Sequence, residues 1–264
     1  MTLSSSSVYP ESTEVAFELA GSLGYDGVEI MVGVDSASSN VSRLSAISQA
    51  SGVPVRSIHA PCLLVTATVW STDPVAKLEK SVEAAGQLGA EVVVVHPPFR
   101  WQRPYAGKFL ETIAELQASS GVTMAVENMY PWRGPFGIDL RAYSPGWDPA
   151  AFDWDHLTLD FSHASTSRRY AADLVEEWGD RLAHVHLCDG RGFPSDDHLP
   201  PGKGDQRADE ALQRLARRGY SGQVVVEINS RRAANPAARR ELLGECLAFA
   251  RTHLGQSESS AESS

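Results

Sequence analysis

The 264-residue sequence predicts an α/β fold, a (β/α)8 barrel (TIM barrel) in a single domain. Short apolar runs alternate with helix-like segments along the whole chain, which is the order expected when parallel strands are joined by crossover helices. With 42% hydrophobic residues, a chain of this length can bury one large core. Several apolar runs end on His, Glu or Asp, and such a barrel collects its active-site residues at the carboxyl ends of its strands.

Strands are predicted where short runs are rich in β-branched residues. The run at residues 91–96, Glu-Val-Val-Val-Val-His, is apolar throughout its middle, which is typical of a strand buried on both faces of a parallel sheet. Taken in order, the strands are expected at residues 2–7, 27–32, 55–59, 91–96, 122–127, 157–160, 182–186 and 224–227.

Helices are predicted from the periodicity of apolar positions and from the residues that start and stop them. Residues 10–13, Pro-Glu-Ser-Thr, are a typical helix start, and Gly24 ends the helix that follows. Pro74 opens another helix, because proline is favoured in the first turn. The helices are expected at residues 14–23, 38–51, 74–89, 105–119, 207–217 and 236–253.

Two segments lack the periodicity of a helix or a strand. Residues 128–154 are rich in Pro, Gly and Trp and are expected to form a long loop on the active face. Residues 255–264 consist mainly of Ser and Glu, which are too polar to join a core. We therefore expect them to form a disordered tail after a barrel domain at residues 1–254.

The composition limits where the protein works and what it binds. The sequence has no apolar run of about 18 residues and no secretion signal at its start, so we expect a cytoplasmic protein without a membrane span. Three widely spaced cysteines do not indicate a disulfide framework. The net charge of −10 disfavours nucleic acid as a partner without excluding it, because like charges repel phosphates. An oligomer is compatible with the sequence.

Polar residues at the strand ends are the strongest functional signal. They end or follow six successive predicted strands, and six of the eight histidines fall on or just after these ends. Converging imidazoles and carboxylates are the donors that divalent transition metals prefer, and bound cations also offset the repulsion between carboxylates. Neighbouring residues would satisfy one such position but not the whole series, so we predict a metal centre. The strand-end residues are His59, His96, Glu127, Asp160 with His163 beyond it, His186 and Glu227.

Two further polar residues lie on these strands. Glu29, on the second strand, is expected either to support a metal ligand or to be a buried, paired carboxylate. His184 lies two residues before His186 and therefore on the same strand face. We predict that it supports or packs against the ligands rather than binding the metal itself.

Seven short motifs follow one another along the chain: Ser57-Ile58-His59-Ala60-Pro61, Val95-His96, Val126-Glu127-Asn128, Leu159-Asp160-Phe161-Ser162-His163, His186-Leu187-Cys188-Asp189, Asp196-Asp197-His198 with Gly202-Lys203-Gly204, and Val226-Glu227. In this order and spacing, the chain resembles the xylose isomerase-like barrels, which include endonuclease IV and the sugar isomerases and epimerases. The resemblance covers nearly the whole chain.

The resemblance implies one to three divalent metal ions per chain, zinc or manganese. The epimerase-type core implies one central ion, and the endonuclease-type pattern adds two more. The implied ligands are Glu127, Asp160, His186 and Glu227 for the central ion, His59 and His96 sharing Glu127 for the second, and His163, Asp196 and His198 for the third.

Two functions are compatible with this resemblance. In the first, the protein is a divalent-metal-dependent isomerase or epimerase that acts on a sugar, sugar phosphate or related polyol ketone through a metal-held enediolate. Glu127 and Glu227 would then be the acid/base pair. His163, Arg191 and Trp132 are candidates for substrate contacts, although Arg191 fits a solvated loop charge, and Trp132 a packing role, equally well.

In the second, the protein is an endonuclease IV-like multinuclear zinc phosphodiesterase that cleaves abasic-site DNA or a small phosphorylated substrate. The retained ligands of the second and third implied ions favour it, because a one-metal isomerase does not need them. A duplex-binding enzyme should, however, surround its pocket with basic and aromatic residues. Residues 33–40 are small and acidic, Cys62 stands where those enzymes place an aromatic residue, and residues 99–103 are the one basic-aromatic patch. We therefore favour the isomerase or epimerase.

Overall fold

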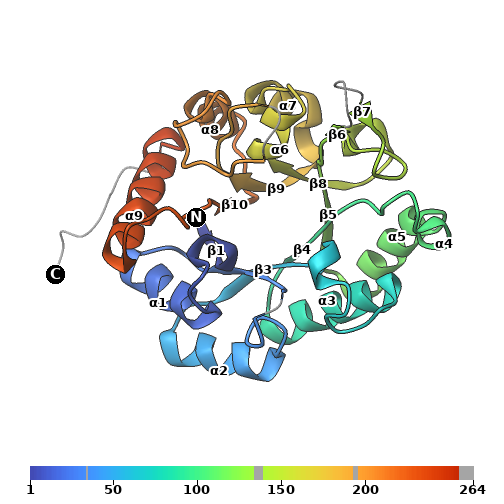
Figure 1. The fold of residues 1–264 in the computed structure, drawn as a ribbon, viewed down its shortest axis with the longest axis horizontal. Coiled ribbons are helices and arrows are strands. Elements are labelled where there is room, and N and C mark those ends of the chain that lie inside the picture. Colours follow the sequence, from blue (N-terminus) through green and yellow to red (C-terminus); the bar gives the residue numbers. More distant parts are fainter. Residues whose placement is uncertain (34, 134–138, 193–195, 256–264) are drawn as a thin grey trace.

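The computed structural model describes residues 1–33, 35–133, 139–192 and 196–255. Eight parallel strands close into a barrel in the order β1-β10-β9-β8-β5-β4-β3-β2, and helices surround it (Figure 1). The predicted (β/α)8 barrel is confirmed. The strands of the barrel are β1 (Thr2–Ser4), β2 (Val28–Met31), β3 (Val55–His59), β4 (Val92–Val95), β5 (Thr123–Glu127), β8 (His156–Asp160), β9 (Leu182–Leu187) and β10 (Gln223–Val226).

The helices form the outer layer of the barrel (Figure 1). Their ends follow the expected chemistry: Gly24 ends the first helix in the left-handed conformation, with φ at 84°, and Asn235 caps the last one through its side chain. The helices are α1 (Thr13–Leu23), α2 (Val41–Ser51), α3 (Pro74–Leu88), α4 (Arg103–Ala106), α5 (Phe109–Ser120), α6 (Phe161–Thr166), α7 (Ala171–Trp178), α8 (Ala208–Arg217) and α9 (Pro236–His253).

Most predicted elements agree with the structure to within one residue at each end, but three differ by three residues or more. The first strand stops at Ser4, because residues 5–8 turn into a 3-10 helix, η1 (Ser5–Val8). The helix predicted at residues 38–51 begins only at Val41, where Asn40 accepts a hydrogen bond from the amide of Arg43. The helix predicted at residues 105–119 is divided into α4 and α5.

Several short elements were not expected. The segment at residues 128–154 contains an antiparallel pair, β6 (Trp132–Arg133) and β7 (Asp139–Leu140), as well as a 3-10 turn at residues 149–151. Helices α6 and α7 lie between β8 and β9, where the sequence predicted no helix. Of the tail predicted at residues 255–264, residues 256–264 lie outside the described residues.

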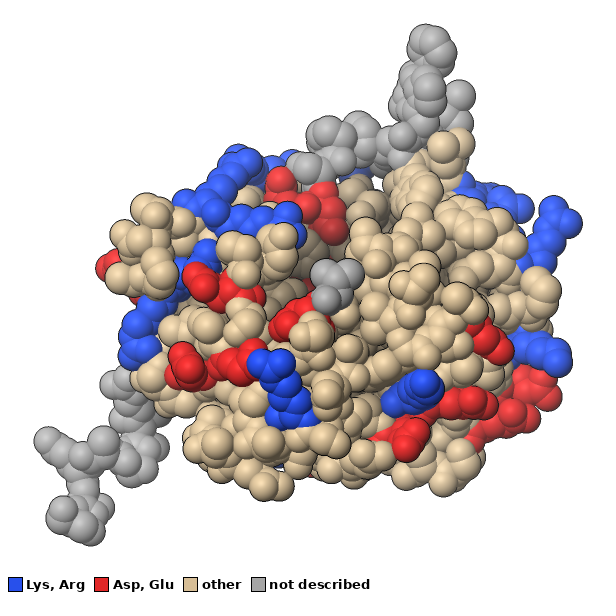
Figure 2. Space-filling model, turned by 60° about the horizontal axis from the view of Figure 1, so that its bottom comes forward, with Lys and Arg blue, Asp and Glu red and all other residues tan. Residues whose placement is uncertain are grey.

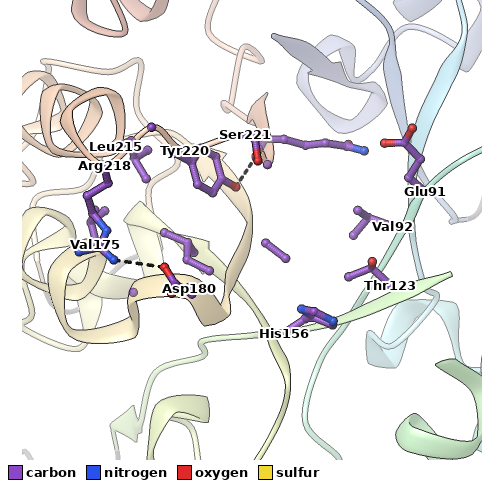
Figure 3. Close-up of a pocket in the computed structure, with 16 residues that line it drawn as sticks. Glu91, Val92, Thr123, His156, Val175, Asp180, Leu215, Arg218, Tyr220 and Ser221 are labelled. Carbon is purple, nitrogen blue, oxygen red and sulfur yellow. Dashed lines mark hydrogen bonds and ion pairs between the residues drawn. The ribbon is translucent and has the colours of Figure 1, made fainter. Parts of the chain in front are cut away.

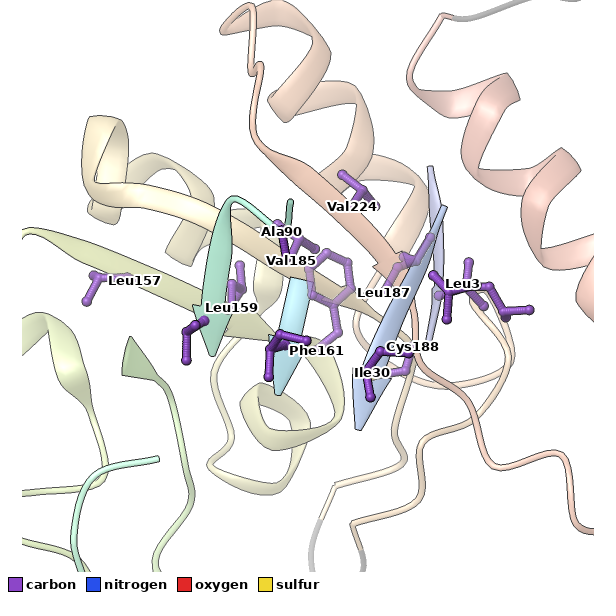
Figure 4. Packing of buried hydrophobic residues seen from close by; sticks show 14 of the residues in the cluster. Leu3, Ile30, Ala90, Leu157, Leu159, Phe161, Val185, Leu187, Cys188 and Val224 are labelled. Carbon is purple, nitrogen blue, oxygen red and sulfur yellow. The ribbon is translucent and has the colours of Figure 1, made fainter. Parts of the chain in front are cut away.

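The barrel strands carry two different faces. On β2, Val28 and Ile30 are fully buried in the large core between strands and helices, together with Leu3 and Leu187 (Figure 4). Glu29, between them, points to the opposite face and so into the barrel. Inside the barrel, an apolar cluster of Val92, Val94 and Ala125 lies on β4 and β5.

The interior of the barrel is also partly polar. The side chains of Glu29, Ser57, Thr158 and His184 are all fully buried there, on β2, β3, β8 and β9. Ser57 donates a hydrogen bond of 2.7 Å to Glu29, whereas Oγ1 of Thr158 has no hydrogen-bond partner among the described residues. Within the described ranges, no helix has the length and apolar character needed to cross a membrane.

Candidate metal centre

The predicted metal ligands gather at the carboxyl ends of the barrel strands. His59, Glu127 and Asp160 are the last residues of β3, β5 and β8, and His96 and Glu227 directly follow β4 and β10. Each of these side chains is buried. Because the eight strands are parallel, their ends meet at one mouth of the barrel.

The central group consists of Glu127, Asp160, His186 and Glu227. Nδ1 of His186 lies 3.1 Å from Glu127 Oε1 and 2.9 Å from Glu227 Oε2. Oδ2 of Asp160 lies 3.7 Å from the same nitrogen. Three carboxylates from three strands therefore converge on one imidazole nitrogen, which is the donor set of a four-coordinate divalent ion.

The second group consists of His59 and His96, which share Glu127 with the central group. Oε2 of Glu127 lies 3.2 Å from Nε2 of His59 and 2.9 Å from Nε2 of His96. The two rings meet edge to face, with their centroids 4.9 Å apart. Glu127 thus faces the central group with Oε1 and the second group with Oε2.

The outer group consists of His163, Asp196 and His198, beside Asp160. Nε2 of His163 lies 3.3 Å from Asp196 Oδ2, and Nε2 of His198 lies 3.2 Å from Asp196 Oδ1. Nδ1 of His198 is 3.9 Å from Asp160 Oδ2. The side chain of Asp196 is 25% exposed, so this group lies nearest to the solvent.

Backbone carbonyls fix which nitrogen faces the carboxylates in three of these histidines. A carbonyl only accepts hydrogen bonds, so an Nδ1 beside one carries the hydrogen and leaves a lone pair on Nε2. In each case this Nε2 faces a carboxylate. A lone pair and a carboxylate repel each other, so a shared proton or a cation must lie between them. The Nδ1 to oxygen distances are 3.1 Å for His59 and Ala60, 2.8 Å for His163 and Asn128, and 3.1 Å for His198 and Glu227. The residues present therefore fit divalent metal.

A family model described as xylose isomerase-like TIM barrel matches residues 17–252 of the chain. The chain belongs to this family. The resemblance predicted from the motifs at the strand ends is confirmed, and the match spans the segment from α1 to α9.

The proteins that are similar to this chain include some with a described activity and some without one. An uncharacterized protein of Mycobacterium tuberculosis is 46% identical over 271 residues, which cover 96% of each chain. Fructoselysine 3-epimerase of Shigella flexneri is 22% identical over 240 residues, 81% of this chain and 84% of that one. The crystal structure of a D-tagatose 3-epimerase-like protein has 25% identity and a TM-score of 0.65, covering 95% of this chain and 98% of that one.

Burial and the histidines act in opposite directions on the carboxylates of this xylose isomerase-like barrel. Burial raises the pKa of Glu227, but the positive charge of His186 outweighs it and lowers the pKa to about 2. Glu127 is likewise buried, yet His186 and His96 hold its pKa well below the usual range. For Asp160, burial prevails and raises the pKa. The group thus holds at least two ionised carboxylates near neutral pH.

The same carboxylates change the histidines. Burial lowers the pKa of His186, but Glu227 and Glu29 raise it well above its usual value. For His163, Asp160 and Asp196 overcome burial in the same way. Without metal, protons on these rings therefore neutralise the carboxylates, and an ion that binds here must displace them.

Sequence reasoning missed three neighbours of the ligands. The hydroxyl of Ser6 donates to Glu227 Oε1 at 3.1 Å, and that of Ser162 donates to Asp196 Oδ1 at 2.6 Å. The ring of Tyr130 lies 5.1 Å from that of His163. The position of Ser6, just after β1, was an available signal, but the expected strand at residues 2–7 hid it.

Two predicted substrate contacts, Arg191 and Trp132, contact residues other than the ligand candidates. The side chain of Arg191 is 61% exposed, with its Nε 3.5 Å from Asp197 Oδ2. Trp132 packs in an aromatic cluster, with ring centroids 5.8 Å from Phe99 and 6.3 Å from Tyr143. Among the described residues, neither forms a hydrogen bond or an ion pair with the nine ligand candidates. The structure brings the nine together, whereas the contacts of these two side chains are with other residues.

Two cavities lie at opposite ends of the barrel. A groove of about 480 Å³ includes Ser6, and so adjoins Glu227; Pro61, Leu63 and Arg231 also line it. A cavity of about 460 Å³ contains Thr123 and His156, which begin β5 and β8 (Figure 3). This second cavity therefore lies at the amino ends of the strands, away from the candidate metal centre. The groove adjoins Glu227, and a smaller cavity of about 110 Å³ is lined by His96 itself.

The distribution of charged residues indicates which kind of ligand this surface can bind. On the face in Figure 2, Lys and Arg side chains are interspersed with Asp and Glu and form no continuous band across the described residues. The whole chain carries a net charge of −10. A duplex-binding protein instead clusters basic residues along the path of the phosphates.

Proposed function

We propose that this chain is a divalent-metal-dependent isomerase or epimerase of a sugar, sugar phosphate or related polyol ketone. The observation that carries the proposal is the central group, in which Glu127 and Glu227 reach the same nitrogen of His186 from β5 and β10. Two carboxylates on either side of one metal position suit proton removal and return at one carbon. The 3-epimerase activities named for the relatives support the same reaction class.

The metal ion is zinc or manganese, held by Glu127, Asp160, His186 and Glu227. When bound, a divalent ion supplies a Lewis acid that polarises a ketone carbonyl and acidifies the neighbouring C–H bond. The histidine nitrogens support this assignment, since each of the three fixed by a backbone carbonyl directs its free lone pair at a carboxylate.

The two glutamates divide the proton transfers between them. Both have lowered pKa values, so both are carboxylates at neutral pH and can accept a proton. One takes the proton from the carbon next to the carbonyl and leaves its electron pair as an enediolate. For inversion, the other glutamate first takes a proton from solvent and then donates it to the opposite face of the same carbon. For isomerisation, the first glutamate returns its proton to the former carbonyl carbon, while the proton of the neighbouring hydroxyl passes to the former carbonyl oxygen.

The remaining parts of the pocket would hold the substrate. His163, buried between Glu127 and Asp196, is the predicted substrate contact that lies among the ligand candidates. Trp132 and its aromatic neighbours offer apolar faces for the C–H surface of a sugar ring. Arg191, on an exposed loop, would reach only a substrate with an anionic group at its far end.

A second candidate function is an endonuclease IV-like zinc phosphodiesterase acting on abasic-site DNA or a small phosphorylated substrate. The second and outer groups favour it, because a one-ion epimerase has no use for His96 or His198. The scattered basic residues and the net charge of −10 weigh against a DNA duplex. A small phosphorylated substrate does not face this objection.

Deuterium exchange tests the proposal directly. We expect protein loaded with manganese or zinc to exchange the hydrogen next to the carbonyl of at least one ketose or ketose phosphate in D2O, measured by proton NMR. Glu227→Gln should reduce this exchange by about 10²–10⁴-fold, because the acid/base carboxylate is lost. Glu91→Gln, at an exposed position before β4, is the matched control and should exchange as the unchanged protein does.

Two results would contradict parts of this proposal. Cleavage of an abasic-site duplex or of a small phosphodiester by the loaded protein, without exchange on any ketose of the panel, would replace the epimerase with the hydrolase. Exchange that survives Glu227→Gln at full rate would remove this residue from the proton transfer.

A further inference from the structure

Glu29 is a wholly buried carboxylate that the proposed reaction does not use. It lies on β2 with 0% exposure, inside the barrel and below the central group. An ionisable side chain so far from water is costly unless other groups bind both of its oxygens. What binds them indicates what Glu29 does.

Both oxygens of Glu29 are occupied. Oε1 lies 3.0 Å from Nε2 of His186. Oε2 accepts a hydrogen bond of 2.7 Å from the hydroxyl of Ser57 and lies 3.0 Å from Nε2 of His184. Strands β2 and β9 are separated by β1 and β10 in the barrel, so this carboxylate joins two strands that are not neighbours.

The contact with Glu29 determines the orientation of the His186 ring. Its Nδ1 faces Glu127 and Glu227, while its Nε2 faces Glu29. An ionised carboxylate only accepts hydrogen bonds, so Nε2 carries the hydrogen and Nδ1 offers the lone pair. A ring turned over about its Cβ–Cγ bond would present a carbon to the metal position instead.

His186 differs from the other oriented histidines in what orients it. Backbone carbonyls hold His59, His163 and His198, whereas a side chain holds His186. A substitution can therefore remove the orienting group of His186 alone. This makes the function of the contact testable without altering a metal ligand.

We infer that Glu29 is a positioning residue of the central metal site: it binds Nε2 of His186 and thereby directs Nδ1 at Glu127, Asp160 and Glu227. Partners of this kind, behind a metal-binding imidazole, raise metal affinity by fixing the ring and its tautomer. The inference rests on the part of the proposed function that puts a divalent ion in the central group, and it is independent of the substrate.

Metal titration of Glu29→Gln tests the inference. We expect the dissociation constant of Co²⁺, titrated into chelator-stripped protein and followed by calorimetry and visible absorption, to rise by about 10- to 100-fold. The number of ions bound at saturation should not change. Ser57→Ala, which removes a different partner of the same carboxylate, is the matched control and should bind Co²⁺ within about threefold of the unchanged protein.

Two results would overturn the inference. Unchanged Co²⁺ affinity in Glu29→Gln would mean that His186 needs no such support. Loss of one whole equivalent of metal, with unchanged binding of the rest, would mean that Glu29, His184 and His186 hold an ion of their own, since their donor atoms lie within 4.8 Å of one another. Substrate is absent from these titrations, so a failed epimerase assay does not affect them.

A measurement on the unchanged protein covers the case in which Glu29→Gln does not fold. Nitrogen-15 NMR of the zinc-loaded protein reports which ring nitrogen of His186 carries hydrogen. We expect the hydrogen on Nε2. A hydrogen on Nδ1 of His186 would overturn the inference.

Discussion

Single side chains in the candidate metal centre differ in pKa because their neighbours differ. Glu227 accepts a hydrogen bond from Ser6 and lies 2.9 Å from His186, which keeps its pKa near 2. Asp160, a ligand candidate of the same group, is fully buried and has a raised pKa. Carboxylates that look equivalent in sequence therefore hold their protons with different strength.

The lowered pKa of Glu227 predicts how the metal-free protein responds to acid. Folding favours the ionised form, so the stabilisation is complete above the ordinary pKa of 4.5 and is lost as pH falls through about 2. We expect urea unfolding of chelator-treated protein to show a free energy that declines between about pH 4.5 and pH 2. Glu227→Gln should decline less steeply over this range. Equal slopes in the two proteins would contradict the prediction.

The sequence indicated which residues lie at the site but not how their rings are turned. Alternation along the strand put His184 and His186 on one face, as the structure has them, with Glu29 contacting both. Which nitrogen of each ring faces a carboxylate depends on contacts such as the one between His163 and the carbonyl of Asn128. Those contacts join residues far apart in the chain, so spacing alone could not reveal them.

Among the elements, the long periodic ones were predicted well and the short buried ones were not. Helix α9 has the predicted bounds, and β3 does as well. Helix α6 has six residues, all of them buried although four are polar, so its sequence shows no alternation of an apolar and an exposed polar face. The 3-10 helix η1 follows β1 without an intervening residue, and the sequence was interpreted as one longer strand.

The cap of α9 gives a prediction at this level. Oδ1 of Asn235 accepts a hydrogen bond of 2.9 Å from the amide of Ala238, and Pro236 starts the first turn. We expect Asn235→Ala to reduce the free energy of unfolding by about 1 kcal/mol, measured with urea, without changing metal affinity. Asn235→Ser restores a capping oxygen and should recover most of the loss. A loss shared equally by both variants would rule out the cap as its cause.

For the whole molecule, the closed barrel explains why residues from His59 to Glu227 meet. Parallel strands deliver their carboxyl ends to one mouth, so the order of the motifs was enough to predict the gathering of the ligands. The loops follow no such rule. Trp132 joined an aromatic cluster with Phe99, and Arg191 faced the solvent, because loop side chains take their positions from local packing.

Metal removal should weaken the whole fold. Without a cation, the buried carboxylates depend on protonated histidines for neutralisation. We expect chelation to reduce the free energy of unfolding by about 3–4 kcal/mol relative to protein with free metal at 100 to 1,000 times its dissociation constant. Urea unfolding at graded manganese or zinc concentrations measures this. Asp160→Asn, which loses a proposed ligand, should gain much less from the metal, and an equal gain would contradict the assignment.

The ligand candidates include one set that is held by the barrel strands and another set that lies in a loop. Six of them, from His59 to Glu227, end or directly follow strands or lie near a strand's end, where the barrel itself holds them. Asp196 and His198 instead belong to the connection between β9 and α8. Replacing that single connection would remove two donors of the outer group and leave the central group intact. The candidate outer group thus depends on the length and sequence of one loop, whereas the candidate central group depends on the barrel strands.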